Sequence, residues 1–281
     1  MLARTTLDWH SELLAAADSI EPLSQTLCEL ATTVSDQSCS VADIAAVVRS
    51  DSALTAIALR EANSVVFGSG SNIVEIEPAI VRVGAARLLA NSVSAALIGS
   101  FDVAVPSYQL ERGELWRHSS VMSHVVELLR PKANTALGAE VVTAALLHDL
   151  GKVLIARLAD EAGVCLGSMS KAESLEAERF IFNLDHAEVG VELARLWNLP
   201  DSIGRAIGAH HEPAGLPEGH ALRIADYAAH LLVPTGSPTM APDDGGALTE
   251  SLSFLEVDFD KLCERARVRL CSLGLIDDES S

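Results

Sequence analysis

The stretch AALLHDLGK, residues 144–152, decides how this sequence is interpreted. It sets a histidine and an aspartate side by side, His148 and Asp149, directly after an apolar run typical of a buried helix. A buried imidazole or carboxylate is costly unless it is hydrogen-bonded or binds a metal ion. Lys152 follows His148 by four residues, so on a helix its ammonium group can contact a phosphate oxygen or a metal-bound water. The stretch alone leaves a hydrogen-bonded core pair and a metal site open.

Further candidate ligands lie on both sides of this stretch. Neutral imidazole is the commonest protein metal ligand, and carboxylates add oxygen donors. Such a mixed nitrogen and oxygen set suits iron, manganese, nickel or zinc better than calcium, and Asp149 could bridge two ions. We therefore expect one or two divalent transition-metal ions. The candidate ligands are His118, His148, Asp149, His186, His210, His211 and Asp226, with Glu114 added because it precedes His118 by one helical turn.

Taken singly, several of these residues have an ordinary interpretation. His118 and His186 are each compatible with a satisfied core histidine, and the adjacent pair at 210–211 with a helix end stabilised by the helix dipole. The ordered series as a whole favours metal binding. The other four histidines show no pattern, and we expect them to be surface or core residues: His10, His124, His220 and His230.

Composition predicts an all-α protein. Of the 281 residues, 49% are hydrophobic but only 4% aromatic, with the Ala and Leu bias of packed helices. A net charge of −19 should repel nucleic acids and anionic membranes, so neither is an expected partner. The five scattered cysteines fit a reducing compartment, and no signal peptide or membrane span is evident. We expect a soluble, cytoplasmic protein.

Two parts are predicted, an N-terminal helical part over residues 1–111 and a second over 112–281 that carries the candidate ligands. In the first part, Ser40 and Asp43 form a capping box, and residues 79–89 predict two helices around Gly84. This pair has the outline of a DNA-binding helix-turn-helix, but the acidity of the chain favours an interior helix pair. The second part predicts helices over residues 114–130, 138–158, 173–182, 186–198, 201–212, 219–232 and 257–273, and a Pro- and Gly-rich surface loop over 233–250.

Five motifs resemble the HDOD domain, an all-helical branch of the HD phosphohydrolase superfamily found in bacterial signalling proteins. They are WRHS at 116–119, LHDLGK at 147–152, DHAEVG at 185–190, WNLP at 197–200 and HHEP at 210–213. Similar segments precede them, among them SDSAL at 50–54 and LREANS at 59–64. The resemblance covers residues 20–232 and implies an HD-like helical bundle preceded by an N-terminal helical bundle.

The resemblance also implies site residues. His118, His148, Asp149 and Asp226 match the core HD site. The histidines at 186, 210 and 211 match the added ligands of dinuclear relatives such as the HD-GYP phosphodiesterases, and Glu114 matches a further acid of some of them. The chain departs after His211, where it lacks the Gly-Tyr-Pro segment, and this argues against cyclic-di-GMP as a substrate.

Two functions follow from the resemblance. HDOD domains are generally signalling modules without catalysis, which implies a protein partner for this chain. The retained ligand set instead favours a metal-dependent phosphohydrolase acting on a nucleotide or cyclic nucleotide, with Asp149 and Lys152 as catalytic residues.

Overall fold

The computed structural model describes residues 22–64, 72–238 and 245–277, together with residues 12, 15–17 and 20. Within these ranges the regular structure is helical, and the β-structure is limited to one isolated bridge between Val105 and Leu110. The predicted all-α class is confirmed.

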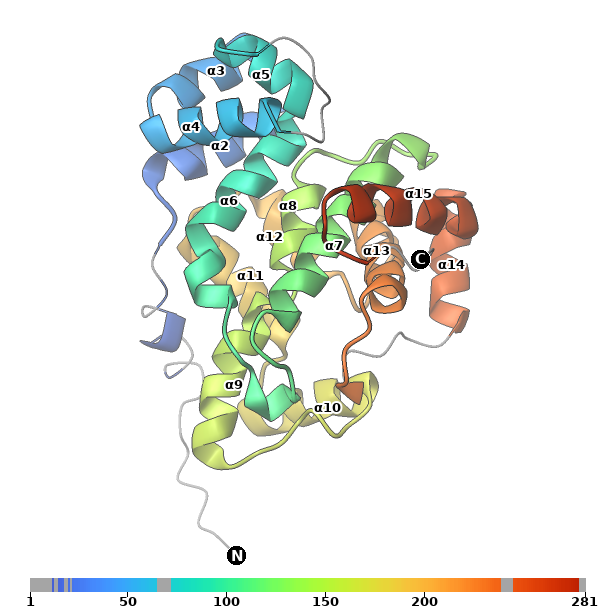
Figure 1. Cartoon of the computed structure of the whole chain (residues 1–281). Coiled ribbons are helices and arrows are strands. Elements are labelled where there is room, and N and C mark those ends of the chain that lie inside the picture. Colours follow the sequence, from blue (N-terminus) through green and yellow to red (C-terminus); the bar gives the residue numbers. More distant parts are fainter. Residues whose placement is uncertain are drawn as a thin grey trace, which may run out of the picture.

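Four short helices gather at one end of the molecule, in blue and cyan in Figure 1. They are α2 (Gln25–Ser35), α3 (Val41–Arg49), α4 (Ser52–Ala62) and α5 (Ile76–Val83). The predicted capping box is confirmed at the start of α3: the Asp43 amide donates to Ser40 Oγ at 3.3 Å, and the Ser40 amide donates to Asp43 Oδ2 at 2.8 Å. This exchange satisfies two backbone donors that a helix start leaves unpaired.

A sharp turn at Gly84 leads from α5 into α6 (Ala85–Phe101), as the predicted helix pair requires. Gly84 has a φ of 86°, which a residue with a side chain rarely adopts, and the two helices meet at 96°. Among the described residues, no single helix is both long and apolar enough to cross a membrane. Among these described residues, the bent α5–α6 pair is the only one that is long and apolar enough when its two helices are taken together, and this rests on length and composition alone.

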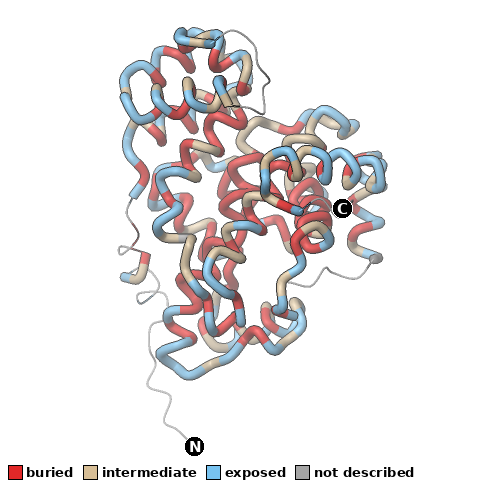
Figure 2. The backbone as a smooth tube through the Cα atoms, viewed as in Figure 1, coloured by how far each residue is buried: buried red, intermediate tan, exposed pale blue. Residues whose placement is uncertain are grey.

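The rest of the chain is organised around α7 (Glu114–Leu129), which packs against α8 (Val141–Leu147), α13 (Pro217–Leu232) and α15 (Phe259–Ser272). Figure 2 shows that buried backbone is concentrated in these central helices. Around them lie η2 (Pro106–Tyr108), η3 (Arg130–Lys132), α9 (Leu150–Ala162), α10 (Lys171–Phe182), α11 (His186–Leu196), α12 (Asp201–Gly208) and α14 (Gly245–Leu255).

Two predicted elements were wrong in part. The helix expected over 138–158 is broken, since α8 ends at Leu147 and α9 begins at Leu150, with Asp149 between them at φ −102° and ψ 6°. The loop expected over 233–250 contains the start of α14. The Pro- and Gly-rich composition of this segment hid the apolar face of α14, on which Leu248 and Leu255 are buried in the core.

Gly151 lets α9 approach the start of α11 closely. A β-carbon at this position would lie 2.0 Å from the backbone oxygen of His186, much closer than atoms can approach. The glycine is therefore required by backbone contact, and the contact brings His186 next to the residues of the helix break.

This contact predicts the effect of Gly151→Ala. The added methyl must push α9 and α11 apart, so we expect the free energy of unfolding to fall by about 1–3 kcal/mol, as for other overpacked cores. Urea unfolding followed by circular dichroism measures the change. Gly99→Ala is the matched control, because Gly99 is exposed on α6 and a β-carbon added there would have no atom within 4 Å, so alanine should be neutral or slightly stabilising. Equal effects of the two substitutions would contradict the close-contact explanation.

Candidate metal centre

The break between α8 and α9 directs His148 and Asp149 into the interior. Their side chains are only 1% and 2% exposed. His148 Nδ1 lies 3.0 Å from the backbone oxygen of Ala145, the carbonyl one turn back on α8. Because a backbone oxygen only accepts, this contact places a ring proton on Nδ1, and it turns Nε2 toward Asp149 Oδ2, 3.3 Å away.

His210 repeats the arrangement of His148 just after the end of α12. Its Nδ1 lies 2.7 Å from the backbone oxygen of Ile207, again three residues back, and its Nε2 is 3.9 Å from Asp149 Oδ1. In both cases a helix end supplies the carbonyl that orients the imidazole, because terminal carbonyls have no intrahelical partner.

His186, the first residue of α11, is oriented by a carboxylate instead. Glu178 Oε2 accepts from both the His186 amide and its Nδ1, each at 2.8 Å, while Tyr108 donates its hydroxyl proton to Glu178 Oε1 at 2.8 Å. On its other side, His186 Nε2 lies 3.2 Å from Asp149 Oδ1 and 2.8 Å from His211 Nε2. A histidine held between a carboxylate and a ligand group is typical of metal sites.

Asp226 on α13 forms the second carboxylate of the centre. Its Oδ1 lies 3.0 Å from His118 Nε2 and 3.0 Å from His230 Nε2, and its Oδ2 accepts from Lys171 Nζ at 2.5 Å. Stacked rings of His118 and His230, with centroids 4.5 Å apart, pack beside it.

These residues form three overlapping groups whose donor atoms lie within 4.8 Å of one another. The groups are His118, His148 and Asp226; His148, Asp149 and His210; and His186, His210 and His211. All seven of the principal predicted ligands are thus brought together from α7, the α8–α9 break, α11, the end of α12 and α13. We call this set the HD cluster.

Burial and charge set the protonation states of the HD cluster. Burial lowers the pKa of His118 to about 4, and burial and neighbouring histidines lower the pKa values of His210 and His211 well below their usual range. These imidazoles are therefore neutral at neutral pH, the form that binds metal. Burial alone would raise the pKa of Asp149, but His148 and Lys152 outweigh it and hold that pKa well below its usual value.

The residues present fit a metal ion. His210 Nε2 is buried without a hydrogen-bond partner, which costs about 1–3 kcal/mol unless something else binds it. Asp149 Oδ1 makes no hydrogen bond either, although His186 Nε2 lies 3.2 Å away. Both atoms belong to one of the three donor groups. Their nitrogen and oxygen donors suit first-row transition metals.

Two lysines also supply positive charge to the HD cluster. Lys152 Nζ lies 2.6 Å from Asp149 Oδ2, and Lys171, the first residue of α10, reaches Asp226. A third cation is His186: burial lowers its pKa, but Glu178 outweighs this and raises it to about 9. The carboxylates of Asp149, Glu178 and Asp226 are thereby matched by the cations of Lys152, His186 and Lys171.

The structure does not bring Glu114 into the HD cluster. Glu114 is the first residue of α7, and its carboxylate turns back to accept from the Glu111 amide at 2.8 Å. Conversely, His230, expected to be a surface or core residue, is buried and in addition contacts the carboxylate of Asp226, one turn before it. That spacing was a visible signal. Lys171, Glu178 and Tyr108 were missed because no local pattern marks them.

The pair of Glu178 and His186 predicts a pH dependence of stability in metal-free protein. The folded pKa of His186, about 9, exceeds its ordinary value of 6.5. Its stabilising contribution, about 3 kcal/mol from the size of that shift, is therefore complete below pH 6.5 and lost as the pH rises through 9.

Glu178→Gln should remove most of this dependence. We expect the free energy of unfolding of the wild type, measured with chelator present, to fall between pH 6.5 and 9.5, and that of the variant to change much less. Glu176→Gln, an exposed change on the same helix, is the control and should behave as the wild type. A wild type whose stability is constant over this range would contradict the assignment.

Comparison with known proteins agrees with this architecture. The HDOD domain family matches residues 20–213. An uncharacterized protein of Treponema pallidum is 28% identical over 217 residues, which cover 75% of this chain and 41% of that protein. The chain therefore spans about two fifths of the length of this relative.

Solved structures share the fold. An HDOD domain protein of unknown function from Geobacter sulfurreducens aligns with a TM-score of 0.64 at 21% identity, over 99% of this chain and 100% of that one. A candidate phosphohydrolase from Shewanella amazonensis gives 0.64 at 21% identity over 94% and 96%. A candidate signal transduction protein from Marinobacter aquaeolei gives 0.68 at 17% identity over 96% and 66%. With the family match extending over most of the helices described above, the chain belongs to the HDOD domain family.

Proposed function

We propose that this chain is a regulatory module of bacterial signal transduction that acts in the cytoplasm by binding a protein partner. In this proposal the HD cluster binds one or two divalent transition-metal ions, which have a structural role and stabilise the packing of the central helices. The strongly acidic chain, with a net charge of −19, disfavours nucleic acid as the partner.

The main support for the proposal is that the HD cluster is buried. His118 is fully buried, and His148, Asp149, His186, His210 and Asp226 are all at most 5% exposed. Only His211 among the seven is partly exposed. A phosphoester must reach the reacting groups, whereas a structural metal site is closed by protein ligands. The two lysines that neutralise the carboxylates support the same interpretation, since they stabilise the closed cluster.

A second function is favoured by a specific observation. Asp149 Oδ1 and His210 Nε2 are buried atoms without a hydrogen bond in a ligand set typical of hydrolases, and Lys152 binds the other oxygen of Asp149. A bound ion would supply an activated water and positive charge for a phosphoester. In such a phosphohydrolase, acting on a nucleotide or cyclic nucleotide, Asp149 would bind the metal and Lys152 would orient Asp149 and stabilise negative charge.

Metal content and turnover, measured on the same samples, separate the two functions. We expect purified protein to contain transition metal by elemental analysis and to hydrolyse neither phosphomonoesters nor cyclic nucleotides with Mn²⁺ added. Asp149→Ala should lower the metal content at least about tenfold, because it removes a ligand from the centre of the cluster. Asp160→Ala, an exposed change on α9, the helix that Asp149 precedes, should leave it unaltered. Turnover that Asp149→Ala abolishes would establish the hydrolase instead, and metal-free protein would refute the metal site.

Lys171→Met tests whether a lysine and a metal ion stabilise the same carboxylates. Without metal, the substitution leaves Asp226 with His118 and His230 as its partners among the described residues, and we expect a loss of about 3 kcal/mol in unfolding free energy. Metal should bind more tightly, because the competing cation is gone, and Mn²⁺ should restore much of the lost stability. Unfolding with chelator and with Mn²⁺ measures both effects, with the exposed Lys132→Met as control. A loss that Mn²⁺ does not alter would show that Lys171 acts only through packing.

A further inference from the structure

A cavity of about 370 Å³, lined by polar and apolar side chains, lies on another side of α7, away from the HD cluster. It opens between α4, α6, α7 and the end of α15. His124 lines it, six residues after His118 on the same helix. Six residues correspond to about 9 Å along the axis and a rotation of about 120°, so the two histidines face different surroundings. The cavity and the HD cluster are separate sites on one helix.

Positive charge is concentrated at the floor of this cavity. Arg87 and Arg269 both donate to the same oxygen, Glu127 Oε2, at 2.6 and 2.9 Å. Arg87 is only 4% exposed and is held further by Ser123, which accepts through its hydroxyl and its backbone oxygen, both at 3.2 Å. Glu127 binds both guanidinium groups and Glu61 also attracts Arg87, so that with Arg60 at the rim three arginines face two glutamates, an excess of one positive charge. The remaining positive charge favours an anion, in a chain that is otherwise strongly acidic.

The rim adds no net charge. Arg60 and Glu61 line the cavity mouth as a pair of opposite sign, 4.0 Å apart, and Arg60 is largely exposed. The charged groups that line or adjoin the cavity are therefore three arginines and two glutamates, Arg60, Arg87, Arg269, Glu61 and Glu127.

Unpartnered polar atoms point to a ligand. His124 is 8% exposed and lines the cavity, yet its Nδ1 is buried without a hydrogen-bond partner. Arg269 Nε is buried and unpartnered as well. Buried groups of this kind are ordinarily satisfied by protein, water or a bound molecule. Hydroxyl and amide side chains, from Ser64, Ser94 and Asn91, form part of the walls, and apolar side chains form the rest.

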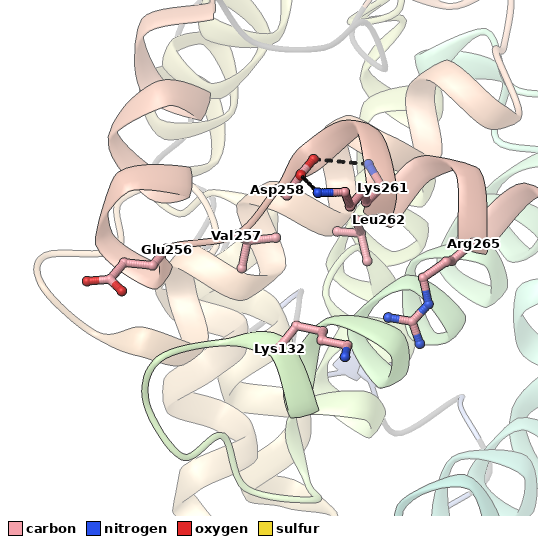
Figure 3. A pocket seen from close by; sticks show the side chains of 7 residues that line it. All are labelled: Lys132, Glu256, Val257, Asp258, Lys261, Leu262 and Arg265. Carbon is pink, nitrogen blue, oxygen red and sulfur yellow. Dashed lines mark hydrogen bonds and ion pairs between the residues drawn. The ribbon is translucent and has the colours of Figure 1, made fainter.

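Another basic hollow on the surface lacks these features. It lies beside the start of α15 and is lined by Lys132, Lys261 and Arg265, all exposed (Figure 3). Lys261 is bound to Asp258 at 2.6 Å, and none of the residues that line this hollow has a buried unpartnered atom. Positive charge is therefore found both in the hollow beside α15 and in the cavity on α7. The cavity on α7 differs in having buried polar atoms without a hydrogen-bond partner.

We propose that this cavity, here called the arginine cavity, binds the phosphate group of a small phosphomonoester. Arg87, Arg269 and His124 approach from three different helices, and a tetrahedral phosphate offers oxygens in several directions for such donors. The volume suits a small metabolite rather than a polymer. Ser64, Asn91 and Ser94 provide partners for the hydroxyl groups of its organic part.

Calorimetric titration of metal-free protein with inorganic phosphate and with glycerol 3-phosphate tests the proposal. We expect saturable binding of both, tighter for the ester, and no comparable binding of succinate. Arg269→Gln should weaken binding at least tenfold, while Arg267→Gln, an exposed change of the same charge on the same helix, should alter it less than twofold. The ring nitrogen resonances of His124 should shift on binding.

Several outcomes would overturn the proposal. Absence of saturable binding would do so, as would equal weakening by the two arginine substitutions, which would indicate general charge attraction. Binding lost in Asp149→Ala would place the phosphate at the HD cluster, and preferred binding of succinate would assign a carboxylate ligand. If Arg269→Gln does not fold, as judged by circular dichroism, His124→Gln should give the same weakening.

Discussion

Two buried carboxylates impose the constraint that the rest of this structure satisfies. Asp149 and Asp226 are 2% and 5% exposed, and an ionised carboxylate in such surroundings is unstable without positive partners. The positive partners are Lys152, three residues after Asp149, and, from more distant segments, Lys171 on α10 and the protonated His186 on α11. The imidazoles of His118 and His230 also contact the Asp226 carboxylate. The central helices are therefore packed so that the carboxylates of Asp149 and Asp226 are neutralised.

Helix termini perform much of this arrangement. The interruption between α8 and α9 exposes a carbonyl that orients His148, the end of α12 does the same for His210, and the first residue of α11 places His186. A continuous helix would have used these carbonyls internally. The close approach of α9 and α11 at Gly151 then brings the separate termini into one cluster. The helix ends and the helix break are therefore the features that position the residues of the HD cluster.

The sequence predicted the helical class from its composition and the family from its motifs. It also predicted that seven candidate ligands lie together, because a series of His and Asp residues in apolar helices is unstable unless its members meet one another or a metal ion. It predicted poorly what depends on tertiary contact. The periodicity of residues 138–158 continues through the break, so the interruption at His148 left no local signal. Lys171 and Glu178 lie on α10, whose sequence is that of an ordinary exposed helix, and only its crossing over the cluster gives them roles. Glu114 shares a helix face with His118, but its place in the first turn diverts its carboxylate to a backbone amide.

The pairing of charges in the HD cluster constrains how related sequences can diverge. Three carboxylates are balanced by two lysines and a protonated histidine, so the loss of one cation leaves an uncompensated charge in the interior. A lineage that replaces Lys171 must then also neutralise Asp226 or depend on a bound cation. A lineage that loses Glu178 removes the carboxylate that keeps His186 protonated. Covariation between α10 and α13 would thus distinguish relatives that require metal from those that have replaced it with side chains.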